Sequence, residues 1–366
     1  MKAPFYSYSL EELCNTLLSA GFEKFRAKQI FDAVYKNKIF SPDLIPALPK
    51  KLKAYLLENF EFSAGKLVGN REAFDETRKY LFELEDGKFV ECVLLEAPSD
   101  DDGKIRKTLC ISTQVGCASG CKFCASGLRG FFRNLTCDEI ISQALPFIKE
   151  ENRNGKIERK FEFENIVVMG MGEPLANYDN LLKALSVFNS PDKFAFGARR
   201  ITVSTCGIAD KLELMAETGF PFRLAISLHG ATNQVREKIM PINKKFPLER
   251  LIPASEKFAK TNGRMITLEY ILIKEVNDSF ADARELVKIA KRLHAHINLI
   301  PYNKVESLDW ERPQASRRTA FAKILKDAGV SHTLRREKGS DIDAACGQLV
   351  LRTEKQKRRN KISASC

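Results

Sequence analysis

The feature that most constrains the fold is a regular alternation of apolar, strand-like runs and amphipathic, helix-like stretches over the last two thirds of the chain. Such βα units predict a parallel sheet, because each helix returns the chain to the same edge of the sheet. The predicted strands are 108–112, 165–169, 200–204, 223–228, 265–273 and 296–300. A capping box at Thr136–Glu139 predicts the start of the first helix. The other predicted helices are 178–189, 208–218, 247–260, 280–293 and 313–328.

Six βα units are compatible with two α/β architectures, a partial (β/α)6 barrel and an open Rossmann-like sheet. Polar residues or glycines follow each predicted strand. They are Gln114, Gly116, Gly170 to Glu173, Ser204, Thr205, Ser227, His229, Lys274 and Asn303. In a barrel these strand ends converge on one rim, where active sites lie. Taken together, they favour the barrel.

The rest of the chain divides into an N-terminal module, a connecting segment and a tail. Residues 8–60 predict three helices with basic faces, and 64–96 predict short strands around a turn. We therefore expect an N-terminal helical accessory domain with an RNA-binding role and a β-hairpin linker. The expected boundaries are 1–62 for this domain, 63–103 for the linker, 104–349 for the barrel core and 350–366 for the basic tail.

The charge balance indicates a polyanionic partner. The chain has 59 Lys and Arg against 47 Asp and Glu, a net charge of +12. Residues 352–361 contribute net +5, so the body keeps +7, and a solvated tail alone does not account for the charge. No run of eighteen apolar residues and no export signal is visible, and the ten cysteines are too sparse for a disulfide scaffold. We expect a reduced, cytoplasmic protein with no membrane partner.

Three of the cysteines form a motif. Cys117, Cys121 and Cys124 have the spacing C-x3-C-x2-C in the loop after the first predicted core strand. A structural zinc site usually needs four ligands, and the chain has no second cysteine pair at metal-ligand spacing. Three thiolates instead suit a [4Fe–4S] cluster that leaves one iron open to a ligand from outside the protein. An open iron indicates catalysis rather than simple electron transfer.

Two further features carry chemistry. The segment 170–174 (GMGEP) follows the second core strand and brings backbone and a carboxylate toward a cationic amine. It is not a dinucleotide-binding loop, because Leu175 stands where the last glycine of that motif is needed. Cys110 and Cys346 are each consistent with an inert buried cysteine, but together they could form a redox pair.

The cysteine spacing within a βα array resembles the radical S-adenosylmethionine (SAM) superfamily, and longer segments resemble one of its families. The residues 339–349, which contain the sequence Asp-Ile-Asp-Ala-Ala-Cys-Gly-Gln-Leu, are similar to the RlmN family of adenine-C2 methyltransferases. The other matching segments are 115–124, 133–136, 169–177, 240–243 and 298–303. The resemblance covers nearly the whole chain.

The resemblance implies a mechanism with two SAM molecules per turnover. Cys346 would take a methyl group from one SAM. The second SAM, on the cluster held by Cys117, Cys121 and Cys124, would give a 5′-deoxyadenosyl radical that removes a hydrogen atom from the S-methyl group. The methylene radical would add to C2 of adenine, and Cys110 would resolve the covalent RNA adduct through a disulfide bond with Cys346.

The family's other site residues follow from the same resemblance. Glu91 matches the proposed proton acceptor. The SAM contacts would be Gly172, Glu173, Ser204, Ser227, Leu228, His229 and Asn303. The implied substrates are 23S ribosomal RNA at the peptidyl transferase centre and transfer RNA at the adenosine 3′ of the anticodon. An electron donor such as flavodoxin and a monomeric state are also expected.

The sequence departs from the family pattern at two positions, and two other functions stay open. Cys206 stands where serine is more common, and Tyr302 where tryptophan is common. We expect neither to contact the proposed chemistry directly. A sister enzyme with the same cysteines methylates adenine at C8, although Pro174 favours the C2 group because the C8 group has alanine there. The second open function is not enzymatic: an RNA-binding module whose fold is held together by a bound metal ion. That function leaves Cys110, Cys346 and Glu173 without a role.

Overall fold

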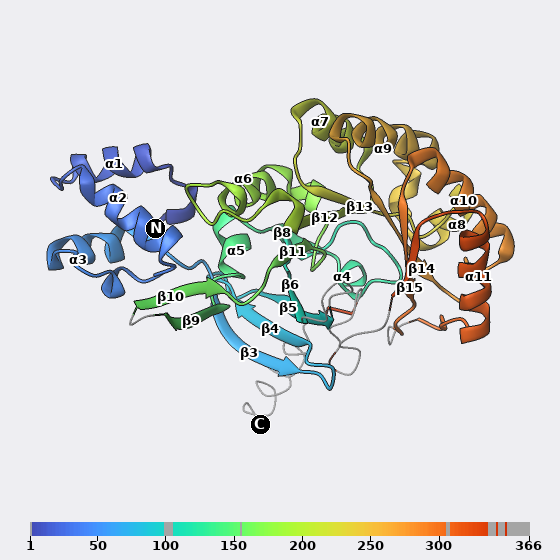
Figure 1. Ribbon diagram of the computed structural model, residues 1–366, viewed down its shortest axis with the longest axis horizontal. Coiled ribbons are helices and arrows are strands. Elements are labelled where there is room, and N and C mark those ends of the chain that lie inside the picture. The colour runs from blue at the N-terminus through green and yellow to red at the C-terminus, as the bar shows by residue number, and fades with distance from the viewer. Residues whose placement is uncertain are drawn as a thin grey trace, which may run out of the picture.

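A ten-stranded mixed sheet forms the centre of the computed structural model (Figure 1), which describes residues 2–98, 105–153, 156–304, 308–335, 342 and 348–349. Six parallel strands lie side by side in the order of the sequence. A Rossmann-like sheet would reverse its strand order at a switch point, so the predicted partial barrel is confirmed. The six strands are β6 (Ile105–Cys110), β11 (Asn165–Val168), β12 (Ile201–Thr205), β13 (Arg223–Ser227), β14 (Thr267–Leu272) and β15 (His296–Pro301). A further parallel strand, β16 (His332–Leu334), was not expected from the sequence.

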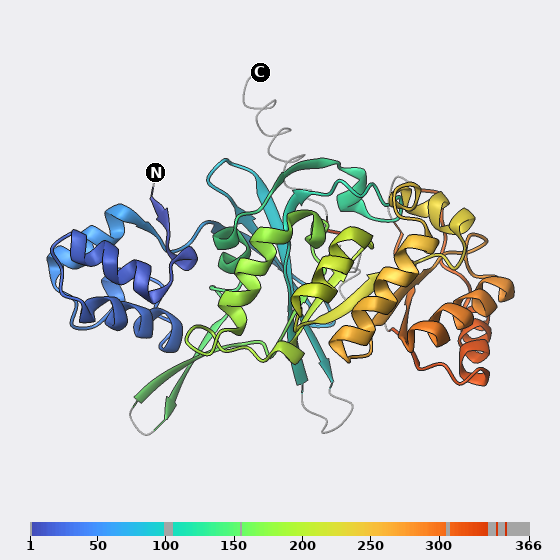
Figure 2. The same cartoon turned by 90° about the horizontal axis from the view of Figure 1, so that it is seen from above.

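Helices cover the outer side of the parallel strands (Figures 1 and 2). Their ends follow local capping rules. Thr136 and Glu139 form the predicted capping box at the start of α5, and left-handed glycines at 219 and 263 end α7 and α9. The helices are α4 (Ala125–Leu128), α5 (Cys137–Ser142), α6 (Tyr178–Asn189), α7 (Ala209–Thr218), α8 (Asn233–Ile239), α9 (Leu248–Asn262), α10 (Phe280–Leu293) and α11 (Ala315–Asp327).

The segment expected to be a linker continues the core sheet. Strands β3 (Lys66–Glu72), β4 (Arg78–Glu83) and β5 (Phe89–Pro98) are antiparallel, and β5 pairs with β6 of the barrel. Two smaller pairs flank the core. They are β7 (Gln114–Gly116) with β8 (Phe131–Asn134), and the hairpin of β9 (Ile148–Arg153) with β10 (Lys156–Phe161), which extends from the body in Figure 2.

The N-terminal module contains three α-helices, as predicted: α1 (Leu10–Ser19), α2 (Phe25–Phe31) and α3 (Lys50–Asn59). A π-helical turn follows α2, and the short strands β1 (Ala3–Pro4) and β2 (Phe60–Glu61) close the module. The module is bonded to the barrel, because Asp138 accepts hydrogen bonds from the Tyr6 amide at 3.0 Å and the Ser7 hydroxyl at 2.9 Å. Its position relative to the core is therefore fixed by buried polar contacts.

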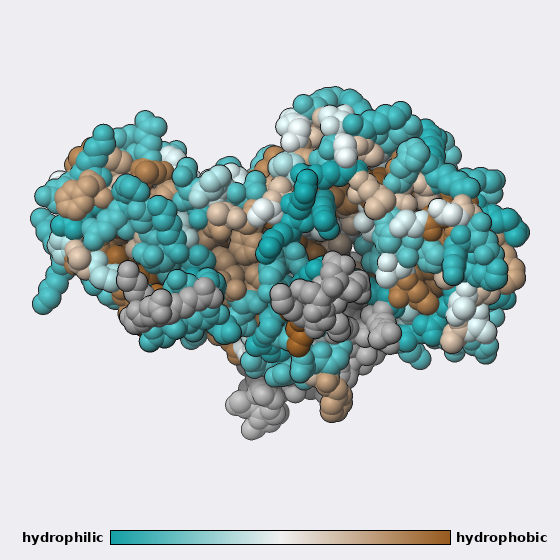
Figure 3. Space-filling model, in the orientation of Figure 1, coloured by the Kyte–Doolittle hydropathy of each residue, from teal (hydrophilic) through white to brown (hydrophobic). Residues whose placement is uncertain are grey.

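The surface is mainly polar. Hydrophilic side chains cover most of the face seen in Figure 3, and more apolar residues show in the recess between the N-terminal module and the barrel. Within the described part of the chain, none of the helices has the length and apolar character needed to cross a lipid bilayer.

Candidate active site

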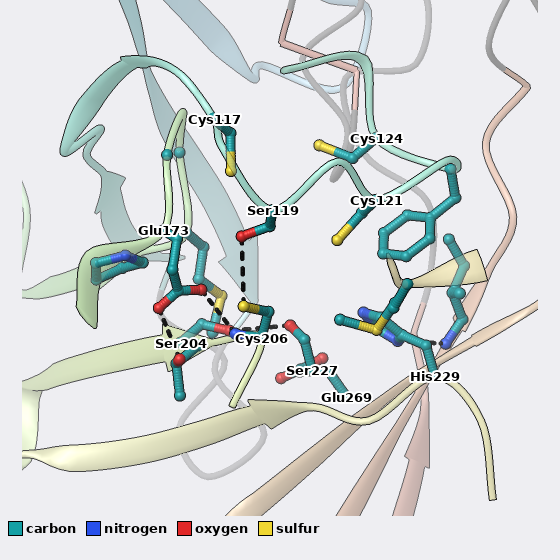
Figure 4. Close-up of a pocket in the computed structure, with 18 of the residues that line it drawn as sticks. Cys117, Ser119, Cys121, Cys124, Glu173, Ser204, Cys206, Ser227, His229 and Glu269 are labelled. Atoms are coloured by element: carbon teal, nitrogen blue, oxygen red, sulfur yellow. Dashed lines mark hydrogen bonds between the residues drawn. The ribbon is translucent and has the colours of Figure 1, made fainter. Parts of the chain in front are cut away.

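A pocket of ≈ 830 Å³ opens at the carboxyl ends of the parallel strands. Its walls come from the loop after β7 and from the ends of β11, β12 and β13, with β14 and β15 completing the lining. This is the rim on which a barrel collects its functional side chains. Figure 4 shows the sulfur atoms of the cysteine motif and several oxygen atoms directed toward this space.

The backbone holds the cysteine loop tightly. Gly116 adopts a φ of +77°, and a Cβ atom there would lie 2.0 Å from the carbonyl oxygen of Gly130. That carbonyl accepts a hydrogen bond from the Cys117 amide at 2.9 Å, and the Cys124 amide donates to the Cys121 carbonyl at 3.1 Å. The motif therefore needs a glycine before its first cysteine, and the turn directs all three side chains to the pocket.

Burial raises the pKa of the Cys117 thiol to about 11 and also raises that of Cys121. Such thiols lose their protons when a metal cation such as iron binds the sulfur and stabilises the thiolate. Among the described residues, no three His, Cys, Asp or Glu side chains are arranged to hold a single metal ion. A [4Fe–4S] cluster makes a different geometric demand, because each thiolate binds its own iron and the three sulfur atoms need not converge on one point.

Glu173 is fixed opposite the cysteines by four hydrogen bonds. Its carboxylate accepts from the Thr205 hydroxyl at 2.6 Å and from the amides of Cys206 at 2.7 Å and Leu175 at 2.9 Å. Its own amide donates to the Gln114 side chain at 2.8 Å. Burial raises the pKa of Glu173 above its ordinary value, although the three donors to its carboxylate act against that rise. The result is a rigid acceptor that lines the pocket.

His229 also lines the pocket, with its tautomer set by the fold. The Nδ1 atom accepts a hydrogen bond from the Ile271 amide at 3.1 Å, so a neutral ring carries its proton on Nε2. Burial, with a smaller effect from Arg236, lowers the pKa of His229 to about 3. The ring is therefore neutral at physiological pH and offers one N–H donor.

The predicted SAM contacts do not all lie in the pocket. Gly172, Glu173, Ser204, Ser227 and His229 line it, and the hydroxyls of Ser204 and Ser227 lie 3.5 Å apart. The Leu228 side chain packs in the hydrophobic core. Asn303 is buried beyond β15, where its side-chain oxygen accepts from Arg312 at 3.1 Å, and it is not part of the pocket lining.

Sequence reasoning missed three residues of the site. Glu269 on β14 lines the pocket, its carboxylate accepts from the Asn298 amide at 2.7 Å, and burial raises its pKa to about 7. Arg236 is fully buried and donates to the carbonyl of Cys206, which itself lines the pocket. Cys206 departs from the family pattern but was expected to stay outside the proposed chemistry, and its place in the pocket lining corrects that expectation. Glu269 sits within an otherwise apolar strand, and Arg236 had no signal in the sequence.

Two of the three predicted catalytic residues, Cys110 and Glu91, lie at the edge of the barrel. Cys110 pairs with Val93 across β5 and β6, so Glu91, two residues before Val93, lies on the same face of the sheet as Cys110. Glu91 is buried and forms an ion pair with Lys79 at 3.2 Å. Cys346 lies outside the described residues, so the structure gives no support to the expected disulfide bond with Cys110.

Comparison with known proteins identifies the family. Residues 111–287 match the model of the Radical SAM superfamily. A probable dual-specificity RNA methyltransferase RlmN 3 of Opitutus terrae is 52% identical over 97% of this chain and 96% of its own length. The chain belongs to the RlmN family. An RlmN homologue of Akkermansia muciniphila is 49% identical over 95% of both chains. The crystal structure of a radical SAM methyltransferase from Sphaerobacter thermophilus aligns with a TM-score of 0.85 at 37% identity, covering 94% of this chain and 98% of that one.

Membership of the radical SAM superfamily implies SAM and a [4Fe–4S] cluster, and the pocket fits both. Cys117, Cys121 and Cys124 supply three soft thiolate ligands on one side. Glu173 faces them with a fixed carboxylate for an ammonium group, and the serine hydroxyls and the His229 N–H provide polar partners for a nucleoside. The chemistry of these side chains is therefore compatible with both groups.

Proposed function

We propose that this protein methylates C2 of adenine in 23S ribosomal RNA and in transfer RNA, using a methyl group carried on Cys346. The observation that carries the proposal is the single pocket in which the three motif cysteines face Glu173, in a chain that matches RlmN relatives over nearly its full length. When bound, the cluster and SAM supply a carbon-centred radical. C2 of adenine is a poor nucleophile, which is why ordinary methyl transfer from SAM does not suffice.

The protein's own residues would hold and orient the reactants. The three cysteines would bind the cluster. Glu173 would accept a hydrogen bond from the SAM amino group, and the neutral His229 would donate one from Nε2. Two SAM molecules would be used per turnover, one as methyl donor and one as radical source. Glu91 would accept the proton from C2, and Cys110, on the same sheet face, would form the resolving disulfide bond with Cys346.

Residues flanking Cys346 support its role. The Leu349 carbonyl accepts a hydrogen bond from the Ser126 hydroxyl at 3.0 Å, and Ser126 belongs to α4, which begins directly after Cys124. Leu349 and Ile342 are both buried. The carboxyl end of the segment that contains Cys346 is thus anchored beside the cysteine loop.

The remaining features of the proposal concern partners. The net charge of +12 suits an RNA substrate, and the basic helices of the N-terminal module would contact it. We propose a monomer in the cytoplasm, where a reducing environment protects both cluster and thiols and where an electron donor such as flavodoxin reduces the cluster.

The test is anaerobic turnover with 23S and transfer RNA fragments, SAM and a reductant, followed by mass spectrometry of the nucleosides. We expect 2-methyladenosine and deoxyadenosine. Cys110→Ala should accumulate a covalent RNA adduct and Cys346→Ala should form none, whereas Cys14→Ala, a buried cysteine of α1, should behave as the wild type. Methyl groups on C8 would favour the resistance-type enzyme, and a zinc-loaded protein that cannot cleave SAM would exclude radical chemistry.

A further inference from the structure

A fourth thiol lies in the pocket with the three motif cysteines. Cys206 follows β12, has a relative exposure of 5%, and lines the same cavity. Its sulfur lies 3.4 Å from the hydroxyl of Ser119, which sits inside the motif between Cys117 and Cys121. Figure 4 shows the Cys206 thiol directed toward the cysteine loop.

The backbone of Cys206 is held on both sides. Its amide donates to Glu173 at 2.7 Å, and its carbonyl accepts from the buried Arg236 guanidinium at 2.5 Å. The following residue, Gly207, has a φ of +95° and donates its amide to the Thr205 hydroxyl. The position of the thiol in the pocket is therefore fixed by the turn and does not depend on a mobile loop.

The position of the Cys206 thiol matters because the three-cysteine motif supplies three ligands for a cluster with four irons. Three thiolates leave one iron of a [4Fe–4S] cluster without a protein ligand. Cys206 lies beside Glu173, because its amide donates to that carboxylate at 2.7 Å, and it lines the same pocket. A thiolate is a soft ligand that iron binds well, whereas a serine hydroxyl at this position would compete poorly.

We propose that the Cys206 thiolate is a reversible fourth ligand of the cluster, bound to the open iron when SAM is absent. The proposal rests on the cluster of the proposed function. When SAM binds, its ammonium group would lose a proton, its amino and carboxylate groups would replace the thiolate on the iron, and the released Cys206 thiolate would take up a proton. No electron is transferred in this exchange. The cysteine protects the cluster at rest and weakens SAM binding by competition.

The experiment compares cluster stability in the wild type and in Cys206→Ser, both reconstituted anaerobically. A cluster with an open iron loses that iron on mild oxidation and gives a paramagnetic [3Fe–4S] form, which electron paramagnetic resonance can count. Without SAM, we expect Cys206→Ser to give about fivefold more [3Fe–4S] per cluster than the wild type. With saturating SAM, the two proteins should give equal amounts.

Two further measurements complete the test. Equilibrium dialysis should show that Cys206→Ser binds SAM about 3- to 10-fold more tightly, because the competing ligand is gone. Cys206→Ala should match Cys206→Ser in both assays, and Cys14→Ser should match the wild type. Equal [3Fe–4S] yields without SAM would overturn the proposal and leave Cys206 as a core cysteine beside Cys121 and Met240. Wild-type protein that assembles no cluster would instead overturn the proposed function.

Discussion

Two buried carboxyl groups face the same pocket but are supported in different ways. Glu173 accepts three hydrogen bonds from neighbouring groups at the ends of β11 and β12, which offset the cost of burial for a charged carboxylate. Glu269, on β14, accepts one from Asn298, and its pKa rises to about 7. The difference shows that burial alone does not determine charge. Burial raises the pKa of both groups, and the hydrogen-bond donors around each carboxylate counteract that rise.

The largest expected effect comes from removing the charge of the well-supported carboxylate. Glu173→Gln offers its donors one acceptor oxygen instead of two and loses the negative charge proposed to bind the SAM ammonium group. A buried, charged hydrogen-bonded contact contributes up to about 3 kcal/mol, so SAM binding should weaken by about 100-fold. Equilibrium dialysis with reconstituted protein measures this change.

The control for this prediction is Glu85→Gln, which changes an exposed acid in the turn between β4 and β5. It should leave SAM binding unchanged. Unaltered affinity in Glu173→Gln would mean that the four hydrogen bonds serve the fold alone, and the contrast between the two carboxyl groups would lose its functional meaning.

A comparable effect, on stability rather than on SAM binding, is expected from moving Glu173 without changing it. Gly172 has a φ of +105°, and an added Cβ would lie 2.6 Å from Cβ and 2.8 Å from the amide nitrogen of Gln114. Gln114 also accepts the Glu173 amide hydrogen bond. Gly172→Ala should therefore destabilise the protein by about 2–4 kcal/mol, through backbone strain and a steric clash.

Chemical denaturation measures the free energy of unfolding of this variant. Gly197→Ala is the matched control, because Gly197 has no heavy atom within 4 Å of an added Cβ and a φ of −61°. The two alanine variants should differ clearly, with the control close to the wild type. Similar stabilities for both would show that the turn before Glu173 can relax, so the rigidity argued for this side of the pocket would be wrong.

The same contrast explains why some residues of the site could be predicted from the sequence and others could not. Glu173 could be found because its supporting groups are local: a glycine turn, a following proline and a strand end form a short pattern. The parallel strands were equally accessible from hydrophobic periodicity. Glu269 depends on Asn298 of the next strand and on burial by the whole barrel, and Cys206 acquires meaning only when the cysteine loop folds against β12. Such contacts between distant segments leave no local pattern.

The last prediction concerns the less-supported carboxyl group and pH. Burial raises the pKa of Glu269 from about 4.5 to about 7, so the folded state binds the proton more tightly than the unfolded state does. The contribution of this group to stability is therefore fully present below about pH 4.5 and is lost as pH rises to about 7, by up to about 3 kcal/mol. Glu269→Gln removes this dependence, so it should match the wild type near pH 5 and be more stable near pH 8.

Chemical denaturation of both proteins from pH 5 to pH 8 measures whether the stability difference between them grows as pH rises. His229 has the opposite dependence, because its lowered pKa makes stability fall as pH drops below about 6.5, but it is present in both proteins and cancels in the difference. Glu249→Gln, which alters an exposed acid on α9, should show no gain at pH 8. A variant that stays parallel to the wild type from pH 5 to pH 8 would mean that Glu269 keeps one charge state across this range, and the titration expected for this carboxyl group would be wrong.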